Sequence, residues 1–290
     1  MTSLGAVVRP QLPPERLRSV AQAADGAGLD ELWLWEDCFL QGGVASAAAA
    51  LAWTQRVRVC VGILPVPLRN VALTAMETAT LDRMFAGRVA LGIGHGVQDW
   101  MGQVGARPAS PLTLLREYAE ALRGLLDGNE VTATGRYVSL DSVRLAWPPT
   151  SAPPIWAGGE GPKTLRLTGE VADGTILTGG TTPDAVRRAR ALIDEGRAAA
   201  GRSGHHHVAV NVPTAFGAGA TQRLAAELRH WGFDASADVG LAGSPERVAD
   251  GIGRWVEAGA DSVVLQPAAD DPDPEGFMQT VGTGVRPLVA

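Results

Sequence analysis

The sequence predicts an α/β fold of the (β/α)8 TIM barrel class, in which eight parallel strands alternate with helices around a closed sheet. Short apolar segments alternate with helical segments along the whole chain, and 290 residues is a normal length for one large barrel. An open, doubly wound sheet is the competing fold, but the persistence of the alternation favours the barrel. We therefore expect residues 1–290 to form a single domain.

The first half of the chain carries four of the expected strand–helix units. Two prolines, Pro13 and Pro14, suit the first turn of a helix, Gly87 ends another, and Ser110 is a suitable N-cap. The segment 58–64 is a continuous apolar run, which is typical of a strand buried on both faces. Strands are expected at 4–8, 31–36, 58–64 and 88–93, and helices at 13–28, 44–55, 71–85 and 111–126.

The second half resumes the alternation after an interruption. The segment 131–138 reads as a small hairpin with Gly135 at its turn, and a Pro-rich stretch follows at 148–154. We interpret both as an insertion before the fifth strand, within one domain. Further strands are expected at 155–157, 175–178, 207–216 and 262–266, and helices from 162, at 183–200, at 221–231, and at 245–258 behind the N-cap Ser244.

Composition and charge narrow the class of protein. Hydrophobic residues make up 46% of the chain and charged residues 19%, which indicates a globular domain. The net charge of −6 and the interspersed acids and bases argue against nucleic acid and against a membrane surface as partners. Two cysteines, Cys38 and Cys60, form no disulfide framework, and residues 1–12 lack the layout of a signal peptide. We therefore expect a cytoplasmic protein.

Function in such a barrel is expected at the carboxyl ends of the strands. The second strand leads directly into Glu36, Asp37 and Cys38, although a helix cap or a turn would explain the same acids. The third strand contains Gly62 and Ile63 shortly before two prolines. This segment is either loop punctuation or a shaped backbone bulge that supports a flat ring.

The fourth strand ends in a glycine-rich segment that contains Gly92, Gly94, His95 and Gly96. It matches a dinucleotide-binding fingerprint only weakly, because the spacing and the following acid are missing. The glycines would let a ligand approach the backbone closely. His95 is either a hydrogen-bonding loop residue or a functional one.

The fifth strand runs into Gly158, Gly159, Glu160 and Gly161, and Pro162 then begins a helix. Free backbone N–H groups at a helix N-terminus favour an anion, so a ligand that carries a phosphate is the natural interpretation. The spacing of a P-loop is missing, and a tight glycine-rich turn is the alternative.

The sixth strand ends in Thr178 and Gly179, and Thr182 with Pro183 reads as an N-cap followed by the first helical position. These glycines and hydroxyls would line the same anion pocket, in agreement with phosphate sites in the later loops of such barrels. No metal site is expected, because the adjacent histidines 205–207 alternate sides on a strand and cannot all reach one ion.

Together these segments resemble the bacterial luciferase-like flavin-dependent oxidoreductase superfamily, and most closely its branch that uses the deazaflavin coenzyme F420. The resemblance spans nearly the whole chain and rests on the order and spacing of several passages rather than on one motif. The passages lie at 64–96, 135–137, 154–159, 168–174, 243–246 and 258–261.

The resemblance implies a non-prolyl cis peptide between Gly62 and Ile63 that supports the central cofactor ring from behind. It places Asp37 at the polar edge of the ring, and the glycine loops 94–96 and 158–161 along the ribityl chain and phosphate. Sugar-phosphate dehydrogenases of this branch carry a histidine where this chain has Cys38, and an acid where it has Val97.

Since that proton-handling pair is missing, we expect no glucose-6-phosphate chemistry, and His95 and Cys38 are the remaining catalytic candidates. The leading hypothesis is an F420-dependent reductase that transfers hydride to an activated C=C, C=N or C=O bond of a small organic substrate. The alternatives are an FMN-dependent monooxygenase with a partner reductase, and a barrel that only stores or senses a flavin. We also expect a homodimer, and loops at 99–111 and 233–242 that cover the pocket.

Overall fold

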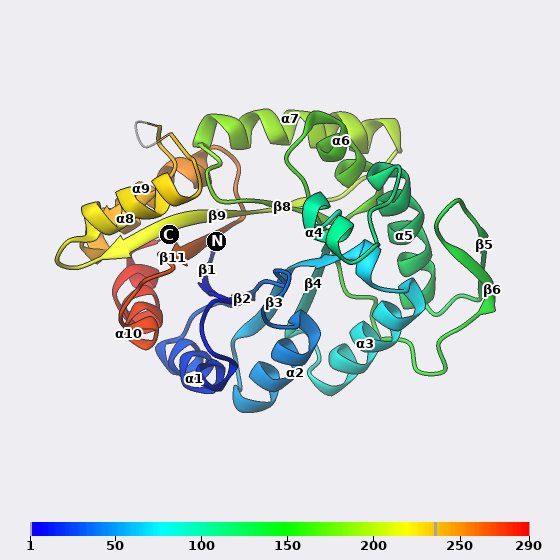
Figure 1. Cartoon of the computed structure of the whole chain (residues 1–290), viewed down its shortest axis with the longest axis horizontal. Helices are drawn as coiled ribbons and strands as arrows, with labels where there is room; N and C mark the ends of the chain where they lie inside the picture. Colours follow the sequence, from blue (N-terminus) through cyan, green and yellow to red (C-terminus); the bar gives the residue numbers. More distant parts are fainter. Residues whose placement is uncertain (1, 235–236, 290) are drawn as a thin grey trace.

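The structure is a computed structural model that describes residues 2–234 and 237–289. Within these residues, eight parallel strands form a closed barrel, because the edge strands β8 and β9 pair with each other. The order around the barrel is β1-β2-β3-β4-β7-β8-β9-β11, and helices surround it (Figure 1). The strands are β1 Ser3–Val8, β2 Glu31–Leu34, β3 Arg58–Pro65, β4 Val89–Gly94, β7 Ile155–Gly158, β8 Gly174–Leu177, β9 His207–Phe216 and β11 Ser262–Pro267. The predicted (β/α)8 barrel is confirmed.

The helices pack on the outside of the strands and join each strand to the next (Figure 1). The N-caps expected at Ser110 and Ser244 are confirmed, since each hydroxyl accepts a hydrogen bond from the backbone of the first turn. The main helices are α1 Leu17–Ala27, α2 Gly43–Trp53, α3 Val71–Met84, α5 Pro111–Leu126, α6 Pro162–Val171, α7 Pro183–Ala199, α8 Ala220–His230 and α9 Pro245–Glu257. Within the described residues, none is long and apolar enough to cross a membrane.

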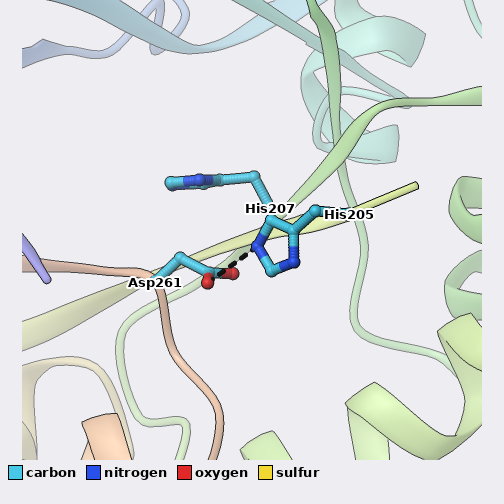
Figure 2. A group of neighbouring side chains, drawn as sticks. All are labelled: His205, His207 and Asp261. Atoms are coloured by element: carbon cyan, nitrogen blue, oxygen red, sulfur yellow. Dashed lines mark hydrogen bonds and ion pairs between the residues drawn. The ribbon is translucent and has the colours of Figure 1, made fainter. Parts of the chain in front are cut away.

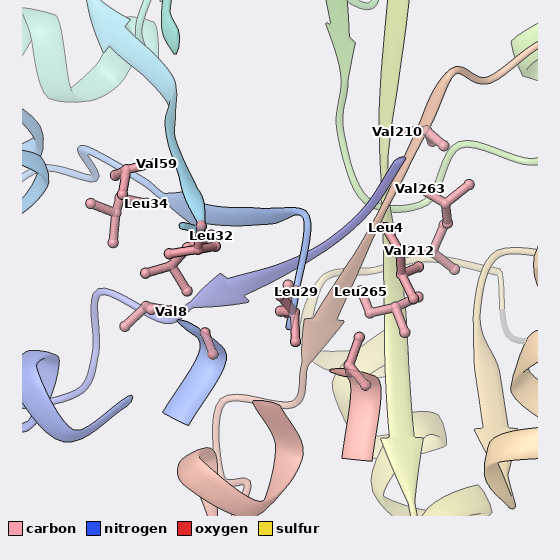
Figure 3. Packing of buried hydrophobic residues seen from close by; sticks show 14 of the residues in the cluster. Leu4, Val8, Leu29, Leu32, Leu34, Val59, Val210, Val212, Val263 and Leu265 are labelled. Carbon is pink, nitrogen blue, oxygen red and sulfur yellow. The ribbon is translucent and has the colours of Figure 1, made fainter. Parts of the chain in front are cut away.

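Alternate side chains along each strand point to opposite sides of the sheet. Those that point outward pack under the helices in two clusters, and Figure 3 shows part of one of them, with Leu4, Leu32 and Val263. Those that point inward fill the barrel, where Trp33 stacks on Trp156 with ring centroids 5.4 Å apart. The middle of the barrel is therefore solid, and a ligand has room only at its ends.

The inserted hairpin is present, but its second strand was predicted too early. β5 Val131–Thr134 pairs with β6 Ser139–Val143, so the turn occupies residues 135–138. The carboxylate of Glu117 on α5 accepts hydrogen bonds from the backbone N–H groups of residues 136–138. Because these donors bind α5, they are not available to the strand ladder.

Several smaller elements were not predicted. The second strand ends at Leu34 rather than at residue 36, and the expected loop 99–111 begins with a short helix, α4 Gln98–Gln103. A further short strand, β10 Leu241–Gly243, extends the sheet beside β9. The chain closes with α10 Pro274–Gln279, the π-helix Thr280–Val285 and a last 3-10 turn.

Candidate active site

The parallel barrel brings the five predicted segments to one end of the molecule. They lie in the carboxyl-terminal part of β2, β3, β4, β7 and β8 or directly after it, and these strands are consecutive neighbours in the sheet. Parallel neighbours place their carboxyl ends at the same edge, so the segments form one continuous arc around half of the barrel mouth. The mouth is defined here as this carboxyl end of the strands.

The part of β3 that contains Gly62 and Ile63 is a bulge, which was one of the two interpretations of this segment. The pairing of β3 with β4 slips between Val61 and Leu64, and the peptide between Gly62 and Ile63 is cis, as the resemblance implied. A second non-prolyl cis peptide, between Cys38 and Phe39, was not expected.

The bulge turns the side chain of Ile63 toward the centre of the mouth. A Cβ atom added to Gly94 would come within 3.1 Å of this side chain, and one added to Gly158 within 2.9 Å. The two glycines of neighbouring strands therefore make room for Ile63, and the three residues form a low apolar platform across β3, β4 and β7. The glycines make space for the side chain of Ile63, and they would also let a ligand approach the backbone closely.

The acids after β2 have separate roles. Glu36 accepts a hydrogen bond from the backbone N–H of Gly43 at the start of α2 and forms an ion pair with Arg69, so it holds structure. Asp37 is half-buried, and burial raises the pKa of its carboxyl while the nearby Arg9 lowers it. Burial and the two acids beside it raise the pKa of the Cys38 thiol, which therefore keeps its proton at neutral pH.

His95 lies half-buried in the loop after β4. Its Nε2 lies 3.3 Å from the hydroxyl of Thr164 on α6, and its Nδ1 is buried without a hydrogen bond of normal geometry. Burial lowers the pKa of the imidazole, although the carbonyl of Pro111 works in the opposite direction. The ring is therefore neutral at neutral pH, so it is ready to accept a proton or to donate a hydrogen bond.

The glycine loop after β7 leads into a helix N-terminus that is open to a ligand. Gly161 caps α6 without any side-chain hydrogen bond, so the first N–H groups of this helix remain available. Glu160 lies in the same loop and accepts a short hydrogen bond from the hydroxyl of Thr178. This bond joins the β7 and β8 loops, but the carboxylate also weakens the attraction of the loop for an anion.

Two buried charged residues at the mouth were missed by the sequence analysis. Arg9, at the end of β1, forms an ion pair of 2.8 Å with Glu227 of α8, and both side chains are almost fully buried. The guanidinium of Arg9 also lies 5.2 Å from the ring centroid of Trp35. Arg9 could have been found from its position at the carboxyl end of a strand, whereas nothing in the local sequence marks Glu227 as a residue of the mouth.

Within the described residues, three buried polar atoms on β9 and directly after β1 and β2 are unpaired. Arg9 Nη2, Trp35 Nε1 and Asn211 Oδ1 are buried and have no hydrogen-bond partner. Such atoms are rare in folded proteins, because each costs about 1–3 kcal/mol when it loses water without replacement. They are therefore the groups that a bound molecule would satisfy.

The loops expected to cover the pocket lie beside the mouth. The ring of Phe233 packs against Gly180 after β8, and Trp231 donates a hydrogen bond to Glu227. Residues 235 and 236, within the predicted loop 233–242, lie outside the described residues. The loop after α4 lines a cavity of about 490 Å³ through Arg107, and Arg69 also lines this cavity.

The residues present fit a flat, polar-edged ring. The Ile63 platform offers an apolar face, and the unpaired N–H groups of Arg9 and Trp35 offer hydrogen-bond donors. The open N-terminus of α6 suits a negatively charged extension of such a molecule.

Comparison with known proteins agrees with this geometry. A family described as luciferase-like monooxygenase matches residues 2–239. The chain is 32% identical over 169 residues to a 5,10-methylenetetrahydromethanopterin reductase of Methanolobus tindarius, which covers 58% of this chain and 51% of the relative. It is 31% identical over 192 residues to an F420-dependent glucose-6-phosphate dehydrogenase of Nakamurella multipartita, covering 60% of this chain and 55% of the relative. The matches thus span little more than half the length of these relatives.

Solved structures share the fold along the whole chain. An F420-dependent secondary alcohol dehydrogenase in complex with an F420-acetone adduct superposes with a TM-score of 0.89 at 22% identity, covering 100% of this chain and 99% of the other. The FMN-bound oxygenating constituent of 3,6-diketocamphane monooxygenase from Pseudomonas putida gives a TM-score of 0.77 at 19% identity, with coverage of 100% and 99%.

Proposed function

Because the chain belongs to the luciferase-like monooxygenase family, we propose that it is an F420-dependent oxidoreductase. It would transfer hydride between the deazaflavin and a small organic substrate with an activated C=C, C=N or C=O bond. The observation that carries this proposal is the Ile63 platform, which faces a mouth with unpaired polar atoms. The curated relatives that use F420 or reduce methylenetetrahydromethanopterin support the choice of cofactor and reaction class.

Each part of the mouth has a role in this proposal. Gly62 and Ile63 would support one face of the ring, and Asp37 would meet its polar edge. The glycine loops 94–96 and 158–161, with Thr178 and Gly179, would hold the side chain and the phosphate. The hydride is the chemistry that the bound cofactor supplies, while the protein provides position and electrostatics.

His95 and Cys38 are the proposed proton-handling residues. The neutral imidazole of His95 suits a base for alcohol oxidation, or a hydrogen-bond donor that polarises a C=O or C=N bond. The thiol of Cys38 keeps its proton and is a second donor. Neither is the histidine–acid pair of the sugar-phosphate dehydrogenases, so a sugar phosphate is not the proposed substrate.

We also propose a cytoplasmic homodimer. The apolar helix α2 is one candidate for the interface, but it buries Ala47, Ala50 and Leu51 in the core, so core packing accounts for its apolar residues. A better surface lies on α3, where Leu73 and Met76 are exposed. Sedimentation of the wild type and of Met76→Lys tests this surface.

The second candidate is an FMN-dependent monooxygenase, which is favoured by the likeness to the FMN-bound camphane enzyme. The apolar platform would suit either ring. The two proposals separate on affinity, since the reductase binds F420 in preference to FMN.

The test is a titration of the protein with F420 and with FMN, followed by ring fluorescence. Gly158→Val places side-chain atoms where Ile63 lies, so F420 affinity should fall by about tenfold, or about 1.4 kcal/mol. Gly253→Val on α9 is the matched control, because a Cβ there meets nothing within 4 Å. Preference for FMN would favour the monooxygenase, and binding of neither would overturn both proposals.

A further inference from the structure

The end of the barrel opposite the mouth holds a cluster of side chains of the kinds that bind metal ions. His205, His207 and Asp261 each offer an atom that lies within 4.8 Å of the other two (Figure 2). His207 begins β9, and Asp261 directly precedes β11, its parallel neighbour. The cluster therefore lies at the amino end of the strands, which we name the floor of the barrel.

As expected, the three adjacent histidines do not all point to one place. Two of them can still contribute to a metal site. His206 is buried on its own, with its Nε2 at 2.8 Å from the hydroxyl of Thr175. His205 and His207 are two residues apart and lie beside Asp261, so the third ligand comes from a neighbouring strand.

The carboxylate of Asp261 is already oriented for a ligand role. Its Oδ2 accepts hydrogen bonds from Arg190 Nη2 at 2.7 Å and from the backbone N–H of Val208 at 2.8 Å. Its Oδ1 lies 2.9 Å from Nε2 of His205, the contact drawn as a dashed line in Figure 2. One oxygen is thus fixed by the protein, while the other faces the histidines.

His207 is held in the way that metal-binding histidines are held. Its Nε2 lies 2.8 Å from the hydroxyl of Ser262, which in turn donates to the buried carboxylate of Glu31 at 3.2 Å. Its ring stacks on Trp156 with centroids 4.7 Å apart. A hydrogen bond on one ring nitrogen fixes the orientation and leaves the other nitrogen, Nδ1, for a metal.

We propose that His205, His207 and Asp261 bind one divalent transition-metal ion of the Zn²⁺ class, at a site separate from the mouth. Two imidazole nitrogens and one carboxylate oxygen suit Zn²⁺, Co²⁺ or Ni²⁺, whereas Mg²⁺ prefers oxygen ligands alone. A tetrahedral zinc site needs ligand atoms about 3.3 Å apart. The side chain of His205 is 65% exposed, so it is free to make the small movement that closes the site.

The bound ion would tie the start of β9 to the start of β11. The site is connected through Ser262 to Glu31, which lies at the start of β2. We therefore expect the ion to raise the thermal midpoint of unfolding and to leave hydride transfer at the mouth unchanged, as stability features at the floor of a barrel do.

The test is calorimetric titration of the chelator-treated, untagged chain with ZnCl2. We expect one ion per chain, and a loss of affinity of at least about tenfold in His205→Ala. His230→Ala is the matched control, because His230 is an exposed histidine on α8 that is not part of the cluster. Since His205 is on the surface, its replacement should preserve the fold, which the thermal midpoint of the metal-free proteins verifies.

Cobalt provides an independent measurement. Addition of Co²⁺ to the wild type should give the strong visible absorption of a four-coordinate site with nitrogen and oxygen ligands, and His205→Ala should lose it. Zinc binding of equal affinity in His205→Ala and the wild type would overturn the proposal. Equal occupancy by Mg²⁺ would overturn the assigned class of ion.

Discussion

The floor of the barrel holds a buried carboxylate, Glu31, and the mouth holds a half-buried one, Asp37, but their surroundings differ. At the floor, Glu31 accepts hydrogen bonds from Trp33 Nε1 at 2.9 Å and from Ser262 Oγ at 3.2 Å. At the mouth, the side chain of Asp37 accepts none from the described part of the chain, and Arg9 Nη2 is also unpaired. Burial raises the pKa of both carboxyls. The difference teaches that the fold supplies hydrogen-bond partners for Glu31 but not for Asp37, which agrees with the proposed ligand site at the mouth.

The largest expected effect is a loss of stability, and it tests whether the Arg9–Glu227 ion pair at the mouth also stabilises the fold. Arg9→Ala leaves the buried carboxylate of Glu227 without its positively charged partner, so the free energy of unfolding should fall by about 3–5 kcal/mol. Denaturant unfolding followed by circular dichroism measures this loss. The double variant Arg9→Met/Glu227→Met removes both charges and should recover most of it. An Arg9→Ala protein as stable as the wild type would show that the ion pair serves the ligand alone.

The next effect concerns chemistry at the mouth. His95→Gln keeps a hydrogen-bonding side chain but cannot exchange a proton, so turnover should fall by at least about 100-fold. Binding of F420 should stay within about threefold, because the platform is intact. Stopped-flow hydride transfer and a fluorescence titration separate the two quantities.

The pH dependence of activity tests the direction of the pKa shift of His95. Since burial lowers the pKa of His95, hydride transfer that uses His95 as the base should persist at pH 6.5 and be lost only at lower pH. His95→Gln should show no such acid limb. A limb that persists in the variant would assign the titration to another group, with Asp37 as the first candidate.

A smaller effect is expected at the floor. Ser262→Ala removes the hydroxyl that joins His207 to Glu31, so the free energy of unfolding should fall by about 1–3 kcal/mol. The affinity for F420 should not change, because the floor and the mouth are separated by the packed Trp33 and Trp156. An equal loss of F420 affinity would contradict the separation of the two ends.

The sequence predicted local features and missed those that depend on tertiary contact. Alternating apolar segments were enough for the barrel, and N-caps at Ser110 and Ser244 were readable because the cap and its partner are neighbours in the chain. The bounds of β9 agree with the predicted 207–216. The hairpin was shifted because Glu117 is distant in sequence from the turn that it binds.

The residues of the candidate site divide in the same way. Strand ends are local, so the arc from Asp37 to Thr178 was visible in the sequence. Glu227 reaches the mouth from the face of a helix, and Asp261 joins His205 only through the register of β9 and β11. Neither the rotation of a helix nor the register of parallel neighbours is set by local sequence, so these partners needed the structure.

Asp37→Asn is expected to have the smallest effect on stability and is the sharpest test of the comparison. Because the folded pKa of Asp37 is raised, the folded state binds this proton more tightly, and ionisation reduces stability as pH rises above the ordinary aspartate pKa of 3.8. The variant should therefore match the wild type at low pH and be equal or slightly more stable at pH 7, by less than about 1 kcal/mol. Its affinity for F420 should nevertheless fall by about tenfold, since the carboxylate is the proposed contact with the ring edge. Unfolding curves at pH 4 and pH 7, with a titration at pH 7, measure both. A large loss of stability at pH 7 would mean that the folded protein supplies partners for the Asp37 carboxylate, as it does for Glu31. The distinction between the two ends would then be removed.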